Sequence, residues 1–288
     1  MMPPTATLPI HRLFMLICGL LIVTALRSAS LPPDFIEEDV GSGWNEAVGI
    51  VFGKNGDGTK DRAYVWERAG RVWIVEDGVK LSTPLLDIRE EVGGWRDYGL
   101  LGLALDPNFQ INGHIYLLYV VDRHHLMKFG TPQYSATTNE YFAATIGRLT
   151  RYTARRDTDF RSVDPQSRRV LIGESKSTGF PILHQSHGTG SLVFGKDGTL
   201  LASCGDGASY EAMDNGGTAG NSYGPQAVAD GIITPAENIG AFRCQLLDSL
   251  SGKVVRIDPA TGDGVASNPH FQSGAPRSAR SRVWAFGL

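Results

Sequence analysis

The sequence predicts an all-β fold. Short extended runs alternate with turn residues along most of the chain, and hardly any stretch shows the periodicity of an amphipathic helix. Glycine is abundant at 35 residues and charged residues make up 20%, as in a globular chain rich in turns. Two strand pairs, "VWERAGRVWIV" and "LVFGKDGTLLA", repeat one pattern of apolar strand, charged turn and apolar strand. This echo favours a propeller over a sandwich or a barrel, because blades bury their faces against their neighbours.

The expected strands follow one another at short intervals and end in turn dipeptides such as Asp-Gly, Asp-Pro and Gly-Asp. Ala69-Gly70 separates the second run from the third, and Lys196-Asp197-Gly198 closes a later hairpin. The eleven runs cover residues 47–53, 63–67, 71–78, 100–107, 114–121, 146–153, 168–173, 191–195, 199–206, 253–259 and 282–288.

One long segment, Ala208 to Leu247, interrupts this rhythm. A connection of this length is usually either functional or disordered. Its mixture of Gly, Asn and aromatic residues is typical of an ordered excursion over one face of a fold, and a mobile surface loop is the alternative.

The N-terminus reads as a secretory signal peptide over residues 1–30. His11 and Arg12 precede an apolar run from Leu13 to Val23, and small residues follow at 28–30. The run is shorter than a spanning helix needs, which favours cleavage near Ser30 over the alternative of an N-terminal membrane anchor. We expect an exported protein, periplasmic or extracellular, with no stable membrane span after cleavage and with one domain over residues 31–288. Its two remaining cysteines, Cys204 and Cys244, either pair or stay free.

Net charge argues against a nucleic-acid partner. The formal charge is -3, so no surplus of Lys and Arg is available to neutralise phosphates. The locally basic run 148–169 alternates with apolar and acidic residues, which predicts a solvated strand face.

Two histidines precede the hairpin of residues 189–204. His187 lies in a loop at the rim of the predicted sheet, where an imidazole can serve as a general base or simply face solvent. A metal pair of His184 and His187 is a further alternative, but no third ligand stands at a recognisable spacing. "KNGDGTKD" (54–61) is a crude echo of a calcium loop and is better explained as a polar hairpin turn.

Four stretches together resemble the glucose/sorbosone dehydrogenase family, whose soluble members are six-bladed quinoprotein propellers. They are "YGLLGLALDPNFQINGHIYLLYV" from Tyr98, "HGTGSLVFGKDGTLLASCGDG" from His187, "LSGKVVRIDPATGDGVASNPHF" from Leu250, and the terminal "RVWAFGL". They occur in the family's order. The resemblance implies an all-β, six-bladed propeller, present in this chain as about four blades with the C-terminal blades missing after Leu288.

The resemblance also implies a chemistry. His187 stands where the family's enzymes have the base that takes the proton of a sugar hydroxyl while hydride passes to pyrroloquinoline quinone (PQQ). Asp206 would bind near this cofactor, and electrons would leave to an acceptor such as a periplasmic cytochrome or quinone. A calcium ion can accompany PQQ, but its ligands cannot be named in this chain.

Three residues depart from the best-known sugar-oxidising member of the family. Ser186 replaces an acid, and Asp97 and Gly207 each replace a glutamine. Oxidation of a sugar or polyol is therefore the leading hypothesis without a defined substrate. The rival hypothesis is an extracellular binding propeller without catalysis, in which Ala208–Leu247 forms the recognition surface.

Overall fold

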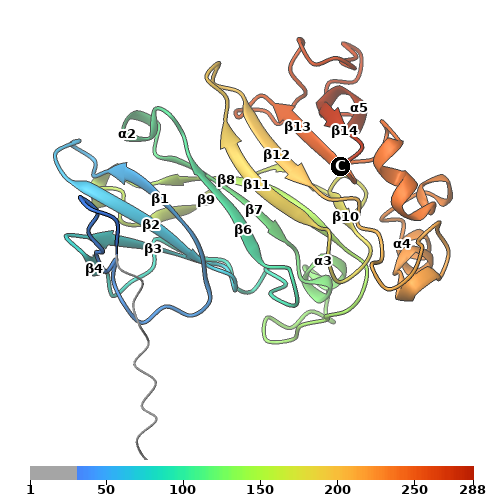
Figure 1. Cartoon of the computed structure of the whole chain (residues 1–288), viewed down its shortest axis with the longest axis horizontal. Helices are drawn as coiled ribbons and strands as arrows, with labels where there is room; N and C mark the ends of the chain where they lie inside the picture. Colours follow the sequence, from blue (N-terminus) through green and yellow to red (C-terminus); the bar gives the residue numbers. More distant parts are fainter. Residues whose placement is uncertain (1–30) are drawn as a thin grey trace, which may run out of the picture. The chain divides into compact units, whose positions relative to one another are not determined.

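A computed structural model describes residues 31–288 (Figure 1). The predicted signal peptide and Cys18 lie outside these residues. The chain divides into two compact units, Met1–Asp39 and Val40–Leu288. In the first, the described residues contain a turn in which the Phe35 N–H donates to the Pro32 carbonyl (3.2 Å). The second contains the strands.

Three antiparallel sheets make up the second unit, as far as residues 31–288 show. The first sheet runs in chain order and consists of β1 (Ala47–Lys54), β2 (Asp61–Glu67), β3 (Arg71–Glu76) and β4 (Val79–Lys80), with β5 (Leu86–Asp87) also paired to β3. Each strand is joined to the next by a short turn, so neighbours in sequence are neighbours in the sheet.

The second sheet has the order β10-β8-β7-β6, with β9 also paired to β8. Its strands are β6 (Leu100–Leu105), β7 (His114–Val120), β8 (Thr145–Ala154), β9 (Val163–Ile172) and β10 (Phe180–Ile182). Short helices occupy three of its connections: α2 (Phe109–Asn112), α3 (Arg123–Lys128) and η1 (Arg156–Thr158).

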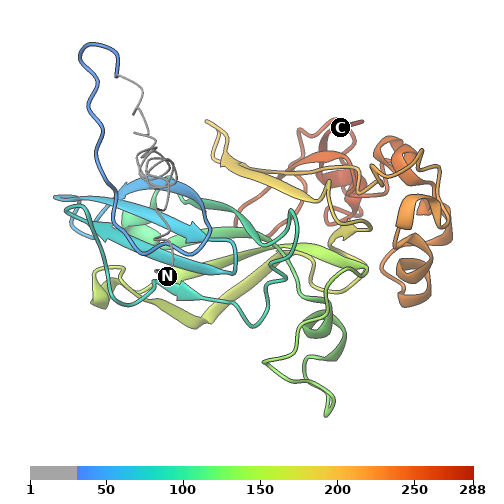
Figure 2. The ribbon, with the colours of Figure 1, turned by 60° about the horizontal axis from the view of Figure 1, so that its bottom comes forward.

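The third sheet again follows chain order. It comprises β11 (Thr189–Phe194), β12 (Leu200–Cys204), β13 (Lys253–Ile257) and β14 (Val283–Phe286), with α5 (Ala279–Arg282) leading into β14. The first strand of each sheet lies next to the first strand of the following one, β1 against β6 and β6 against β11. Figure 2 shows the sheets from a second direction. This succession of edge strands is the arrangement of propeller blades.

Burial of the middle sheet on both faces explains its uninterrupted apolar strands. In β7, Ile115, Leu117 and Tyr119 belong to the core shared with the first sheet, while Tyr116 and Leu118 belong to the core shared with the third. Alternate side chains of a strand point to opposite faces, so a strand between two cores must be apolar at every position. The sequence "HIYLLYV" meets this requirement.

All eleven strands expected from the sequence are present, with ends that differ by a few residues. The structure adds three short ones, β4, β5 and β10, which are too brief to show a period. The described residues form three sheets, fewer than the roughly four blades expected from the sequence. Segment 208–247 contributes short helices instead of strands: η2 (Ala219–Asn221), α4 (Gly224–Asp230), η3 (Pro235–Glu237) and η4 (Gly240–Gln245). None of the helices within residues 31–288 is long and apolar enough to cross a bilayer.

The basic run 148–169 is largely solvated, as predicted, and most of its arginines are exposed: Arg155, Arg156, Arg161, Arg168 and Arg169. Arg148 departs from the prediction, because it is buried and its Nη1 lies 2.5 Å from Glu91 Oε1. The exposed Arg168 reaches the same carboxylate at 2.7 Å.

Candidate functional site

Two backbone hydrogen bonds join the start of β11 to the end of β12. The Gly205 N–H donates to the Gly188 carbonyl (2.8 Å), and the Gly207 N–H donates to the His187 carbonyl (3.0 Å). Asp206 therefore lies beside His187 although the two are far apart along the hairpin. The rim loop predicted from the sequence brings both candidate residues together.

The His187 and Asp206 side chains contact each other directly. His187 Nδ1 is 3.1 Å from Asp206 Oδ1, which also accepts the Ala208 N–H at 3.0 Å. The His187 side chain is 49% exposed and that of Asp206 is 21% exposed. When Nδ1–H donates to the carboxylate, Nε2 is the nitrogen left to accept a proton. The geometry is that of a general base with its orienting carboxylate.

His187 has a left-handed backbone, with φ of 59°. Bulky residues adopt this region rarely, and such strained positions concentrate at functional sites. Close packing maintains it, since a Cβ on Gly205 would lie 2.6 Å from the His187 carbonyl oxygen. Glycine at 205 is thus required by the approach of the two loops.

His184 has a different environment. Its side chain is fully buried, the Tyr210 ring meets it edge-on with centroids 5.0 Å apart, and its Nε2 is 3.8 Å from Glu211 Oε1. Burial lowers the pKa of His184, an effect that Glu211 opposes. Its Nδ1 has no hydrogen-bond partner in the described structure. His184 is therefore an internal anchor for segment 208–247.

The structure offers no support for a metal pair of His184 and His187. The two imidazoles face separate carboxylates, those of Glu211 and Asp206. Across residues 31–288, no group of three or more His, Cys, Asp or Glu side chains is placed to hold a metal ion.

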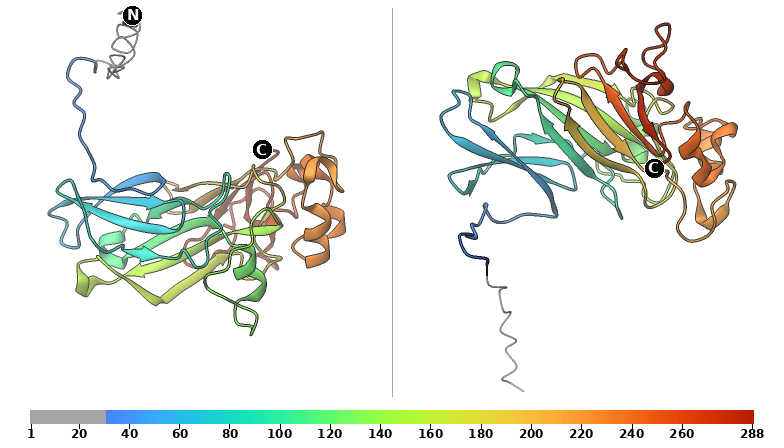
Figure 3. Two further views of the ribbon diagram at one scale, coloured as in Figure 1. Left: turned by 90° about the horizontal axis from the view of Figure 1, so that it is seen from below. Right: turned by 45° about the horizontal axis from the view of Figure 1, so that its top comes forward.

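Segment 208–247 is held by two buried polar residues, Asp214 and Arg243. Asp214 Oδ2 accepts the Ser209 N–H (2.9 Å), its Oδ1 accepts the Gly216 N–H (3.0 Å), and its carbonyl accepts the Ala241 N–H (3.0 Å). The guanidinium of Arg243 donates to the carbonyls of Glu237 (3.0 Å) and Asp206 (3.1 Å). The segment, the orange run of short helices in Figure 3, is therefore an ordered excursion.

Large apolar side chains project from this framework. Tyr210 is 57% exposed, Met213 is 89% exposed and Phe242 is 63% exposed. Met213 precedes the buried Asp214, and Phe242 follows Ala241, which Asp214 binds. We call Tyr210, Met213 and Phe242 the apolar tip of the segment.

Cys204 and Cys244 are not bonded to each other. Cys204 is buried in β12, and burial raises the pKa of its thiol to about 12. Such a thiol stays protonated and unreactive at neutral pH. Of the two alternatives expected from the sequence, the structure has the free thiols.

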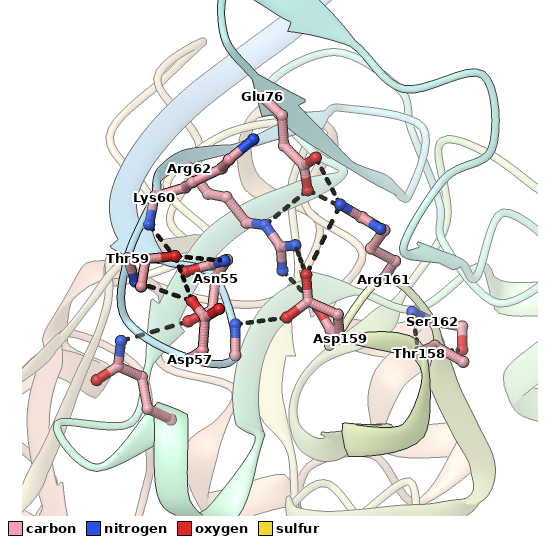
Figure 4. Close-up of polar contacts among 12 residues, drawn as sticks. Asn55, Asp57, Thr59, Lys60, Arg62, Glu76, Thr158, Asp159, Arg161 and Ser162 are labelled. Carbon is pink, nitrogen blue, oxygen red and sulfur yellow. Dashed lines mark hydrogen bonds and ion pairs between the residues drawn. The ribbon is translucent and has the colours of Figure 1, made fainter.

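The loop "KNGDGTKD" is a hairpin turn between β1 and β2, as predicted. The Asn55 side chain accepts the Lys60 N–H (2.9 Å) and Asp57 accepts the Thr59 N–H (2.9 Å), so these oxygens serve the turn itself. Figure 4 shows the turn beside the buried Arg62, whose guanidinium pairs with Glu76 (2.7 Å) and with Asp159. This cluster ties the first sheet to the β8–β9 connection.

The sequence alone did not reveal His184, Asp214 or Arg243 as site residues. The sequence suggested His184 only as half of a metal pair. Asp214 and Arg243 lie in a segment without strand or helix periodicity. Buried polar residues in irregular segments give no periodic signal, because their partners are brought together by tertiary folding and do not recur at a regular spacing along the chain.

The Glucose / Sorbosone dehydrogenase family profile matches residues 56–288. Hedgehog-interacting protein of Homo sapiens is 30% identical over 269 residues, 88% of this chain and 30% of that protein. The Mus musculus protein is 30% identical over 266 residues, with 87% and 30% covered. The chain thus spans about 30% of the length of these curated relatives.

Two solved structures show the fold. The PQQ-bound aldose sugar dehydrogenase of Streptomyces coelicolor superposes with a TM-score of 0.53 at 18% identity, over 86% of this chain and 52% of that chain. The putative oxidoreductase (glucose dehydrogenase) of Thermus thermophilus gives 0.51 at 21% identity, over 85% and 52%. The three sheets are therefore blades of a β-propeller of the quinoprotein glucose dehydrogenase type, as the sequence predicted. With its profile matched over most of its length, this chain belongs to the Glucose / Sorbosone dehydrogenase family.

Proposed function

We propose that this chain is a recognition propeller that binds a protein partner through segment 208–247. The observation that carries the proposal is the apolar tip. Tyr210, Met213 and Phe242 are exposed side chains on a segment whose backbone is fixed by buried hydrogen bonds. Large exposed apolar groups on a rigid framework are unfavourable in water unless a partner covers them.

The chemistry of the surface matches that of protein interfaces. Aromatic residues, Met and Arg are enriched there, and methionine adapts its shape to a partner. Polar groups flank the tip: Gln185 Nε2 donates to the Tyr210 hydroxyl (2.6 Å), and Arg96 Nε donates to Gln185 Oε1 (2.8 Å). An apolar centre with a polar rim is the usual anatomy of a binding site.

The curated relatives at 30% identity are named for interaction with Hedgehog. A Hedgehog signalling domain is therefore the first partner to test. The measurement is calorimetric titration of this domain into the purified chain, with Met213→Glu and Phe242→Glu as the test variants and Ile111→Glu as the control. Ile111 is 75% exposed on α2, away from the segment.

The proposal predicts saturable binding that both test variants weaken at least tenfold and that the control leaves unchanged. Equal weakening by all three variants would point to a general effect of added charge and would refute the assignment. Absence of binding would refute the Hedgehog partner.

We also propose that the chain is exported. The apolar run Leu13–Val23 with its preceding basic residues is the support. Expression of the full chain in secretory cells, followed by N-terminal sequencing of the protein in the medium, should find a mature terminus close to residue 31. Retention of residues 1–30 in the cell-associated protein would contradict a cleaved signal.

Oxidation of a sugar or polyol is the second candidate function, favoured by the His187–Asp206 pair. The pair can orient an imidazole and take a proton from a hydroxyl group held near Nε2. The structural relative from Streptomyces coelicolor is an aldose sugar dehydrogenase in its PQQ-bound form.

Arg243, the buried cation next to this pair, does not fit the role of a PQQ ligand. This quinone carries carboxylates that need free cationic partners. The buried Arg243 already donates hydrogen bonds to Ser251 Oγ (3.3 Å) and to the carbonyls of Glu237 and Asp206. Asp97 and Gly207 also stand where the sugar-oxidising member has amides. We therefore place catalysis second.

Quinone titration distinguishes the two functions. The purified chain is mixed with PQQ and Ca²⁺, and aldose-dependent dye reduction is followed together with cofactor binding. Turnover that His187→Ala abolishes while folding is preserved would establish oxidation. PQQ that fails to bind a chain competent for protein binding would leave recognition as the function.

A further inference from the structure

A cavity of about 310 Å³ lies apart from the His187–Asp206 pair and shares no residue with it. It is enclosed by the β9–β10 connection, residues 232–237 of the excursion, residues 248–250 and α5. Its lining residues include the apolar Ile232 and Leu250 and the polar Thr178, Arg277 and Arg282. Its volume lies at the lower end of the range of small-molecule sites, ~300–1,000 Å³.

Arg282 is the unusual member of this wall. Its side chain is 2% exposed. Nε donates to the Gly262 carbonyl (2.8 Å) and Nη2 donates to the Leu171 carbonyl (3.0 Å). Nη1 makes no hydrogen bond to any of the described residues. A buried guanidinium thus keeps an unused donor nitrogen in a residue that lines the cavity.

Arg282 has only a weak, shared counter-ion among the described residues. Glu174 lies 3.9 Å from its Nη2 and is paired more closely with Arg277, which also binds Asp263 at 3.0 Å. Burial and the neighbouring Arg277 lower the pKa of Arg282 to about 10. A charge buried without a close partner is costly, and a bound anion would offset that cost.

The remaining acids of the wall are engaged elsewhere. Asp248 pairs with Arg280 (2.8 Å), and Glu237 Oε2 accepts the N–H of Thr234 (2.8 Å). Asp248 is exposed and Glu237 is partly exposed, whereas Arg282, Ile232 and Leu250 are buried. The buried part of the wall therefore offers one cationic donor next to apolar surface.

We propose that this cavity binds a small organic carboxylate, whose oxygen accepts a hydrogen bond from Arg282 Nη1 while its carbon skeleton packs on Ile232 and Leu250. A planar guanidinium suits a carboxylate, and the apolar wall suits a skeleton of a few carbons up to a single sugar ring.

Isothermal titration with sodium glucuronate at constant ionic strength tests the site. Glucose, which has the ring without the carboxylate, and sodium sulfate, an anion without a carbon skeleton, are the comparison ligands. The expected result is one saturable site for glucuronate, with glucose and sulfate binding at least tenfold more weakly. Equal binding of glucose or sulfate, or no saturable binding of glucuronate, would overturn the proposal.

Two variants assign the binding to the cavity. Arg282→Met removes the donor, and Ala279→Phe fills the cavity from α5 while leaving Arg282 in place, which covers the case that the first variant does not fold. Arg155→Gln is the control for the loss of a positive charge, because the exposed Arg155 pairs with Asp157 and neither residue lines the cavity. We expect at least a tenfold loss of glucuronate affinity in each folded test variant and none in the control; an unchanged affinity in Ala279→Phe would place the ligand elsewhere.

Discussion

His187 and Gly205 meet at a separation that leaves no room for a side chain. A Cβ at Gly205 would come within 2.6 Å of the His187 carbonyl oxygen. The contact positions the imidazole through the backbone, because Gly207 N–H also binds that carbonyl. The candidate base is therefore fixed by main-chain packing as well as by Asp206.

Gly205→Ala should destabilise the chain by about 1–3 kcal/mol, the usual cost of overpacking a tight contact. Urea unfolding followed by circular dichroism measures the change. Gly274→Ala is the control, since a Cβ there meets nothing within 4 Å. An equal effect at both positions would mean that the close approach to His187 has no energetic importance.

The buried Lys253 should make the free energy of unfolding depend on pH. The side chain is fully buried in β13, its Nζ donates to the Cys244 (2.7 Å) and Ser251 (2.6 Å) carbonyls, and burial lowers the pKa of the ammonium to about 8. The folded chain therefore releases this proton near pH 8, whereas the unfolded chain keeps it until about pH 10.4. Between these values the unfolded state binds more protons, so this group's contribution to stability rises with pH.

Lys253→Met removes that contribution. The free energy of unfolding of the parent minus that of the variant should increase by up to about 1.4 kcal/mol per pH unit between pH 8 and 10. Urea titrations of both proteins at several pH values give the difference, in which other titrating groups cancel. A flat difference would show that Lys253 is not desolvated as the structure implies.

At the scale of elements, the strands were predictable and the irregular segments were not. Apolar alternation and turn dipeptides located β1 to β3, β6 to β9 and β11 to β14, because these signals are local. β10 escaped since three residues with a proline in the middle show no period. The short helices of segment 208–247 are held by Asp214 and Arg243, whose hydrogen-bond partners lie mainly in irregular turns of the same segment and give no periodic signal.

The same limit applies to the candidate site. The position of His187 in the rim loop made it a candidate base, and the resemblance to a family gave His187 and Asp206 their specific roles. Only the structure supplies their 3.1 Å contact. The burial of Arg148 against Glu91 was not predicted. Charge alternation along a strand does not reveal that both faces of the sheet are covered.

The ion pairs around Arg62 join elements from two sheets. Arg62 is fully buried in β2, and it binds Glu76 of β3 and Asp159 of the β8–β9 connection, while Arg161 also contacts Glu76 (2.8 Å) (Figure 4). A buried cation that loses a partner is costly to keep.

Asp159→Asn should therefore lower the free energy of unfolding by about 2–4 kcal/mol, slightly below the loss seen for fully buried pairs because Asp159 is partly exposed. Asp157→Asn is the matched control, as Asp157 pairs with the exposed Arg155 on the same connection. Chemical denaturation of both variants provides the comparison, and a control as unstable as the test variant would contradict a special role for Arg62.

At the scale of the whole molecule, the outward faces of the first and third sheets carry exposed apolar side chains. Val48, Ile50 and Phe52 are 40%, 41% and 70% exposed on β1, and Trp284 and Phe286 are 44% and 43% exposed on β14. The middle sheet packs against a core on both faces, whereas the first and third sheets expose apolar side chains on the edge strands β1 and β14. Exposed apolar surface of this kind promotes association.

The chain should self-associate at high concentration, and Phe52→Lys combined with Trp284→Lys should reduce this association. Sedimentation velocity over a concentration series measures it. Phe129→Lys is the control for added charge, because Phe129 is 62% exposed at the end of α3 and belongs to neither β1 nor β14. Association that persists in the double variant would show that these faces are not responsible.

The separation of the anchors Asp214 and Arg243 from the apolar tip has a consequence for how this chain can change. The anchors stabilise the segment from inside, so substitutions at Met213 and Phe242, whose side chains project outward, leave the framework intact. A randomised library at these two positions should consist largely of folded proteins that differ in what they bind. Related chains could diverge in partner through a few outward substitutions while conserving one scaffold.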